Sequence, residues 1–87
     1  MISTTLPLSD PFGSLSDREA GSGEALVLIH GVGMQSAAWA PQIEALSKTH
    51  RVLSLDMPGH GGSSALAEGA NLAAYVAWLH AALGALN

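Results

Sequence analysis

One apolar run followed by glycines constrains the fold of this chain more than any other feature of its sequence. Residues 25–29 (ALVLI) are continuously apolar, and residues 30–33 (HGVG) follow at once. A run that is apolar on both faces and ends in glycines at strand length is typical of a strand buried in a parallel sheet. Parallel strands are joined by helical crossovers, so the pattern predicts an α/β protein.

The rest of the chain continues this alternation of strands and helices. Trp39, Ile43 and Leu46 recur at helical spacing, which predicts a helix over about 37–48 with Pro41 in its first turn. Residues 51–56 are compatible with a second strand, and a helix is expected over about 71–86 with Asn71 as its N-cap. We expect strands 25–29 and 51–56 to be parallel and joined by the first helix.

The apolar positions of the second helix predict which of its faces packs on the sheet. They follow the 3.6-residue period and comprise Leu72, Tyr75, Val76, Leu79, Leu83 and Leu86. Trp78 lies off this stripe, which suggests a contact with something outside the chain. Trp39 is expected to belong to the core.

Residues 1–24 differ in composition from the rest of the chain. They are rich in Ser, Gly, Pro and Asp and show no sustained periodicity, which predicts turns and at most short edge strands. We therefore expect a turn-rich segment over 1–24 and an α/β unit over 25–87.

Composition and charge argue against several classes of partner. The net charge is −4 and the three basic residues are scattered, which argues against nucleic-acid binding. No apolar run approaches the ~20 residues that span a bilayer, and the first residues lack a secretory signal; we therefore predict a cytoplasmic protein without a membrane partner. The chain has no cysteine, and its four histidines lack metal-ligand spacing, so we expect no metal and no other cofactor. Apolar residues at 48% against 11% charged suit part of a larger fold.

The HGVG segment has two interpretations when taken alone. Glycines at the carboxyl end of a strand permit positive φ and let main-chain N–H groups face open space. Such N–H groups can hold an oxyanion during acyl transfer. A strand-exit turn without any chemistry fits the four residues equally well.

A second glycine-rich motif changes this balance. Residues 56–63 (DMPGHGGS) close the second predicted strand, as HGVG closes the first. With both motifs in this order, and with Trp39 between them, the sequence resembles the α/β-hydrolase superfamily in its lactonase, esterase and carbon–carbon hydrolase branch. The resemblance extends from about Ser16 to the end. It implies a partial α/β-hydrolase fold, with 25–87 as the N-terminal portion of the domain, and a small-molecule ester or acyl substrate for the complete protein.

The resemblance also implies roles for the residues of the first motif. The main-chain N–H of Val32 would line an oxyanion hole, and Gly31 and Gly33 would shape the turn. Met34 would face the substrate cavity. His30 would be a structural neighbour of the pocket rather than the catalytic base.

The second motif is expected to form a structural loop. Asp56 would organise it by accepting hydrogen bonds from the main-chain N–H groups of residues 59–63. Gly59, His60 and Gly61 belong to this loop.

The family's nucleophile is missing from the sequence. It occupies a Gly-x-Ser-x-Gly turn between a strand and a helix, followed by an acid and a histidine. No such motif occurs in the 87 residues, and the nearest approach is residues 62–65 (GSSA). We therefore expect the N-terminal part of a hydrolase that is inactive alone, whether as a truncated gene product, a partial record or half of a split protein.

Two other classes of protein remain open. Gly31, Gly33 and Ser36 imitate a dinucleotide-binding fingerprint, and Asp56 ends the next strand where a ribose-binding acid would lie. The serine in place of the third glycine and Pro41 inside the expected helix argue against this class. The third class is a non-catalytic interaction protein, in which a second chain or an oligomer completes the open sheet.

Overall fold

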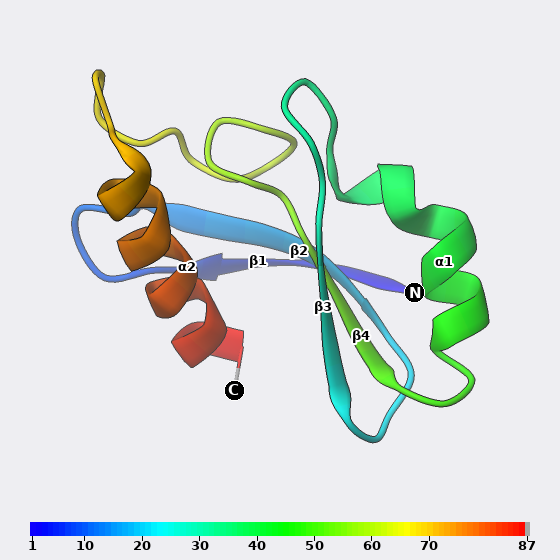
Figure 1. The fold of residues 1–87 in the computed structure, drawn as a ribbon. Helices are drawn as coiled ribbons and strands as arrows, with labels where there is room; N and C mark the ends of the chain where they lie inside the picture. The colour runs from blue at the N-terminus through cyan, green and yellow to red at the C-terminus, as the bar shows by residue number, and fades with distance from the viewer. Residues whose placement is uncertain (87) are drawn as a thin grey trace.

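A four-stranded mixed sheet separates two helices in the computed structural model, which describes residues 1–86 (Figure 1). The elements in chain order are β1 (Ile2–Pro7), β2 (Ser14–Ala20), β3 (Ala25–Ile29), the 3₁₀ turn η1 (Ser36–Trp39), α1 (Ala40–Leu46), β4 (Arg51–Leu55) and α2 (Leu72–Leu86). The order of the strands across the sheet is β1-β2-β4-β3. The α/β class and both predicted strands are confirmed, although β4 ends one residue earlier than expected.

The parallel pair is the part of the sheet that positions the loops. β3 pairs with β4 in parallel, from Ala25 opposite Arg51 to Ile29 opposite Leu55, as predicted. β2 lies antiparallel on the other side of β4, and β1 is antiparallel to β2. β4 is therefore central, and its last four residues are all buried.

The two helices lie on opposite sides of the sheet, and side-chain alternation along β4 divides the core between them (Figure 1). Leu53 and Leu55 join Leu15 of β2 and the buried side of α2 in the main hydrophobic cluster. The Ser54 hydroxyl points the other way and donates to the carbonyl of Ser36 in η1 at 3.0 Å. This alternation is the period of two that any strand imposes.

The packing face of α2 agrees only in part with the predicted apolar stripe, of which Leu79 and Leu86 contact the core. Trp78, Ala82 and Leu86 are buried against the sheet, and Trp78 is fully enclosed by this chain. The expected contacts of Leu72 and Val76 with the sheet are wrong, since these side chains are 80% and 59% exposed. Because α2 carries no charged residue, its periodicity does not select one face, and the largest side chain takes the core position.

The first 24 residues contain more regular structure than expected. They form a hairpin of two strands, and β2 is an interior strand with Leu15 fully buried. β3, in contrast, was expected to be buried on both faces and is half exposed, with Ile29 at 42%. Within residues 1–86, β4 is the only strand beside it, so its outer edge has no strand partner.

Both helices begin next to the residues that were expected at their starts, Pro41 for α1 and Asn71 for α2. The Asn71 side chain accepts the N–H of Ala74 at 3.0 Å, which confirms it as the N-cap of α2. The first helix is shorter than predicted: a 3₁₀ turn precedes α1, and Pro41 lies in the first turn of the helix. In the described part of the chain, no helix has the length and hydropathy that crossing a bilayer requires.

Candidate functional site

Two loops meet at the carboxyl ends of the parallel strands. The β3 loop (residues 30–35) and the β4 loop (residues 56–71) leave the same edge of the sheet, because β3 and β4 run in the same direction (Figure 1). In open α/β sheets this edge is where ligands bind. All nine of the site residues expected from the sequence belong to these two loops.

The β3 loop is a tight turn whose tip faces solvent. The Met34 N–H donates to the Gly31 carbonyl at 3.1 Å, and Gly33 has a φ of +83°, as the third position of a type II turn requires. Val32 is 97% exposed. Within residues 1–86 its main-chain N–H donates to no protein acceptor, whereas the neighbouring Gly33 N–H donates to His60. Of the two central residues of the turn, Gly33 therefore has its N–H occupied and Val32 has its N–H free.

Asp56, the first residue of the β4 loop, connects this loop to η1, the 3₁₀ turn that follows the β3 loop. Its carboxylate accepts the main-chain N–H of Ser36 at 2.7 Å and that of Gly62 at 3.3 Å, and the residue is only 4% exposed. Burial alone raises the pKa of this carboxyl, but the hydrogen bonds outweigh it and hold the pKa below its ordinary value. The Gly62 bond falls within the expected range of donors; the shorter bond, to Ser36 beyond the β3 loop, had no signal in the sequence.

The two loop histidines connect the two loops. The Nε2 atom of His30 accepts the Met57 N–H at 3.0 Å, and the Nε2 atom of His60 accepts the Gly33 N–H at 3.0 Å. The ring centroids are 5.0 Å apart. His30 is buried.

The β4 loop is held to the sheet by serine and glycine. Ser63 donates its hydroxyl to the Asp56 carbonyl at 2.6 Å and accepts the Ser16 N–H at 2.9 Å. Gly61 has a φ of +51°, and a Cβ there would lie 2.4 Å from the Asp56 Cγ atom. Ser63, in the nearest approach to a nucleophile motif, is thus a buried group bound to main chain.

A cleft of about 270 Å³ opens between these loops and the start of α2. Its lining comprises His30, Gly31, Val32, Met57, His60, Leu72 and Tyr75. Leu72 and Tyr75 were expected on the core face of the helix, but they line this cleft. Met34 lines a separate, smaller cleft of about 180 Å³ beside Trp39, on the other side of Gly31.

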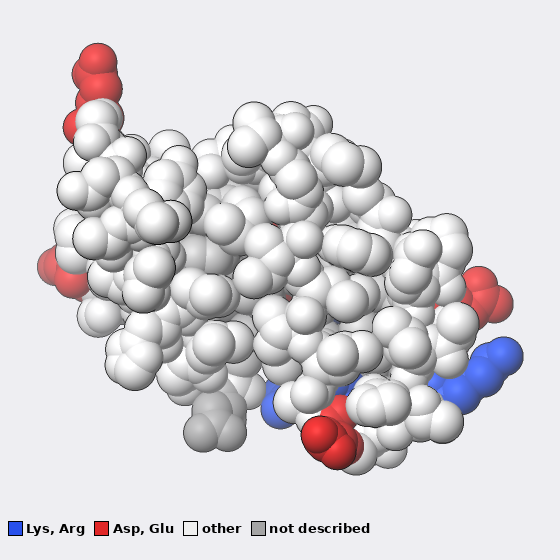
Figure 2. Space-filling model, in the orientation of Figure 1, with Lys and Arg blue, Asp and Glu red and all other residues white. Residues whose placement is uncertain are grey.

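The surface around the site is uncharged. In the space-filling view the acidic and basic side chains lie at the rim of the face, while its centre, over β3 and α2, carries none (Figure 2). Within residues 1–86, no three His, Asp or Glu side chains gather as metal ligands would. The cleft thus offers main-chain donors, two imidazoles and apolar walls.

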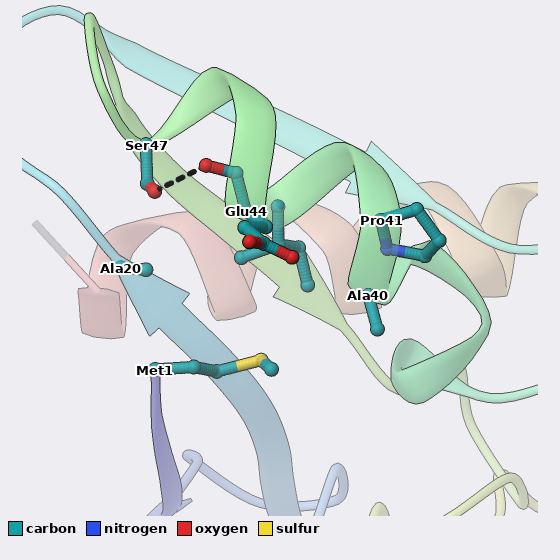
Figure 3. Close-up of a pocket in the computed structure, with 7 residues that line it drawn as sticks. Met1, Ala20, Ala40, Pro41, Glu44 and Ser47 are labelled. Atoms are coloured by element: carbon teal, nitrogen blue, oxygen red, sulfur yellow. Dashed lines mark hydrogen bonds between the residues drawn. The ribbon is translucent and has the colours of Figure 1, made fainter.

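A larger hollow of about 510 Å³ lies away from the loops, between α1 and the first two strands. Figure 3 shows α1 on one side and Met1 and Ala20 on the other. Glu44 is its single ionisable side chain, and the Ser47 hydroxyl beside it donates to the Glu44 carbonyl at 3.1 Å. No cluster of reactive groups faces this hollow, so the loop site is the better candidate.

The strands, the crossover and the two loops define an α/β protein with a site at the carboxyl edge of its sheet. The chain belongs to the alpha/beta hydrolase fold family, whose model matches residues 24–86. Asp56 argues independently against dinucleotide binding, because its buried carboxylate is already occupied by Ser36 and Gly62.

Curated relatives carry hydrolase names. The chain is 55% identical over all of its 87 residues to an (E)-2-((N-methylformamido)methylene)succinate hydrolase from Acinetobacter baylyi, and covers 33% of that protein. It is 47% identical over 53 residues, 61% of this chain and 20% of the other, to a pimeloyl-[acyl-carrier protein] methyl ester esterase from Aliivibrio salmonicida. The chain thus spans a third or less of the length of these relatives.

Solved structures agree on the fold. An E-2-(acetamidomethylene)succinate hydrolase superposes with a TM-score of 0.88 at 27% identity, over 98% of this chain and 31% of the other. A hydrolase from Pseudomonas aeruginosa superposes with a TM-score of 0.82 at 33% identity, over 97% of this chain and 32% of the other.

Proposed function

We propose that this chain is the N-terminal part of a serine-type hydrolase and supplies one donor of its oxyanion hole, the main-chain N–H of Val32. The observation that carries the proposal is the state of that N–H: it is exposed at the tip of a turn, beside the cleft, with no acceptor among residues 1–86. A fixed N–H aimed at open space stabilises the negative oxygen that forms when a nucleophile attacks a carbonyl.

The chain alone is proposed to be inactive because it holds no activated nucleophile. The serine nearest to the motif, Ser63, is buried and bound to the Asp56 carbonyl. Both ring nitrogens of His30 and of His60 are hydrogen-bonded to main chain, so neither histidine can take a proton from a serine. An oxyanion donor without a nucleophile has no intermediate to stabilise.

The proposed substrate of the complete enzyme is a small carbonyl compound. The Acinetobacter baylyi relative, by its name, hydrolyses a succinate that carries an N-methylformamido group, and the Aliivibrio salmonicida relative is named as an esterase. Because the first likeness covers the whole of this chain at 55% identity, an amide-bearing methylene succinate is the first substrate to test.

We also propose that further polypeptide completes the sheet beside β3. Its outer edge has no strand partner among residues 1–86, Ile29 at its end is exposed, and the exposed Leu83 of α2 lines a cleft together with Val27 of β3. An open edge beside apolar surface favours pairing with another strand. The strand that pairs with this edge can belong to a continuation of the same polypeptide, to a second chain or to another copy in an oligomer.

A chimera tests the proposed function. Residues 1–87 would replace the corresponding third of the Acinetobacter baylyi hydrolase, and turnover of that enzyme's named substrate would be measured. We expect the chimera to hydrolyse it, and the 87-residue chain alone to give no turnover of this substrate or of an activated ester. Saturable turnover by the chain alone, or a folded chimera without activity, would contradict the proposal.

A further inference from the structure

The β3 loop carries the proposed oxyanion donor but has almost no packing to hold it. Val32 is 97% and Met34 is 52% exposed. Around the position that a Cβ would take on Gly31 or on Gly33, no heavy atom beyond the adjacent residues of the chain lies within 4 Å. A loop without packed neighbours keeps its shape only through hydrogen bonds, and a displacement of about 1 Å at a reacting centre can cost on the order of 10²-fold in rate.

Two of those hydrogen bonds form a reciprocal pair. His30, at the start of the β3 loop, reaches across to the β4 loop and accepts the Met57 N–H at 3.0 Å. His60, in the β4 loop, reaches back and accepts the Gly33 N–H at 3.0 Å. Each loop therefore supplies one imidazole and one main-chain donor, so that neither loop can move without losing both bonds.

The hydrogen bonds of the remaining ring nitrogens indicate the tautomer of both histidines. The Nδ1 atom of His30 is 2.7 Å from the Gly31 carbonyl, and that of His60 is 3.0 Å from the Pro58 carbonyl. A carbonyl oxygen only accepts, so each Nδ1 must carry a hydrogen, while each Nε2 must be unprotonated to accept an N–H. In both rings Nδ1 is thus the donor and Nε2 the acceptor.

We propose that His30 and His60 form a reciprocal clasp that positions the β3 loop for catalysis. The proposal rests on the proposed function of Val32, and it makes both histidines positioning residues. Because His60 occupies the Gly33 N–H, the clasp selects which of two adjacent N–H groups stays free. In this arrangement the Val32 N–H faces the substrate, and the Gly33 N–H stays bound to His60.

The first test detects the two hydrogen bonds of the clasp without any substrate. In the ¹⁵N-labelled chimera, an N–H···N hydrogen bond transmits a ¹⁵N–¹⁵N coupling between donor and acceptor. We expect couplings from Gly33 N to His60 Nε2 and from Met57 N to His30 Nε2. Their absence in a folded chimera would overturn the clasp.

The second test reads its effect on turnover. His60→Phe keeps a ring but removes the acceptor, and we expect kcat to fall by about tenfold to hundredfold while KM changes less than about twofold. His60→Gln restores an acceptor at the position of Nε2 and should recover most of the rate. The exposed His80 supplies the control, since His80→Gln should leave the rate unchanged.

The outcomes separate the clasp from the function on which it rests. An unchanged kcat in His60→Phe overturns the positioning role, and so does a failure of His60→Gln to recover the rate lost in a folded His60→Phe protein. If removal of the Val32 N–H itself leaves kcat unchanged, the proposed function fails, whereas the couplings still report whether the two loops are clasped.

Discussion

Asp56 allows the connection between the β4 loop and η1 to be measured as a free energy. Its carboxylate accepts the N–H of Ser36 at 2.7 Å and that of Gly62 at 3.3 Å, in a side chain almost removed from solvent. Asp56→Asn keeps the shape, removes the charge and turns an NH₂ group toward one of the two donors. Hydrogen bonds to charged groups are worth about 1.5–3 kcal/mol each. Losing one and weakening the other should lower the free energy of unfolding by about 2–4 kcal/mol.

Asp17 offers a matched control with the opposite sign. It is fully buried in β2; one carboxylate oxygen accepts the Thr4 hydroxyl, and the other has no partner within residues 1–86. Burial raises the pKa of Asp17, and the Thr4 hydrogen bond only partly opposes it. Asp17→Asn removes this buried charge, so at pH 7 it should leave the free energy of unfolding unchanged or raise it by about 1 kcal/mol.

The contributions of the two aspartates to the free energy of unfolding also depend on pH with opposite signs. The pKa of Asp56 is lower in the folded state, so its stabilisation is complete above its unfolded pKa of about 4 and is lost as the pH falls through the folded value. The pKa of Asp17 is higher in the folded state, so ionised Asp17 destabilises the folded protein above its folded-state pKa. This destabilisation is relieved as the pH falls from that pKa toward the unfolded pKa of about 4. Asp56→Asn should therefore reduce the loss of stability in acid, and Asp17→Asn should increase it.

The assay is urea unfolding of the chimera at pH 7 and below pH 4, with amide hydrogen exchange as the local measurement. In Asp56→Asn the protection of the Ser36 and Gly62 amides should fall together. The reasoning is refuted if Asp56→Asn is as stable as the parent chimera at pH 7, or if Asp17→Asn loses as much stability as Asp56→Asn.

Three further predictions follow from packing. Trp78→Ala should cost about 3–5 kcal/mol in urea unfolding of the chimera, whereas His80→Ala, at an exposed site of the same helix, should change the free energy of unfolding by less than about 0.5 kcal/mol. Gly61→Ala, whose Cβ would lie 2.4 Å from the Asp56 Cγ atom, should lower the melting temperature, while Gly31→Ala, in open space, should not. Light scattering at micromolar concentration should find the isolated chain associated or loosely folded; a monomer with a cooperative melt would contradict this.

Local patterns in the sequence predicted the elements that depend on few neighbours. The bounds of β3 follow from its apolar run and from the glycines after it, and the start of α2 follows from Asn71, whose side chain accepts the Ala74 N–H. The parallel pairing of β3 with β4 follows from the helix between them. In each case the determining residues lie within the element or next to it.

Features that depend on distant residues could not be predicted in this way. Trp78 packs against strands more than twenty residues earlier in the chain, and an uncharged helix gives no sign of which face will meet them. β2 is interior because β4 lies beside it, although its own sequence, SLSDREA, is mostly polar. The glycine motifs located both loops, but the bond of Asp56 to Ser36 depends on the folded path of two loops at once.

The main-chain N–H of Val32 is the group on which the proposed function depends, and chemical synthesis can remove it. In the chimera, the hydroxy-acid analogue of valine at position 32 turns the amide between residues 31 and 32 into an ester and leaves the side chain unchanged. The same replacement at the exposed Gly69 is the control. Loss of one oxyanion donor lowers kcat by about 10²- to 10³-fold, and we predict this loss for the ester at position 32 alone. A kcat within about twofold of the control would contradict the assignment of Val32 as the oxyanion donor.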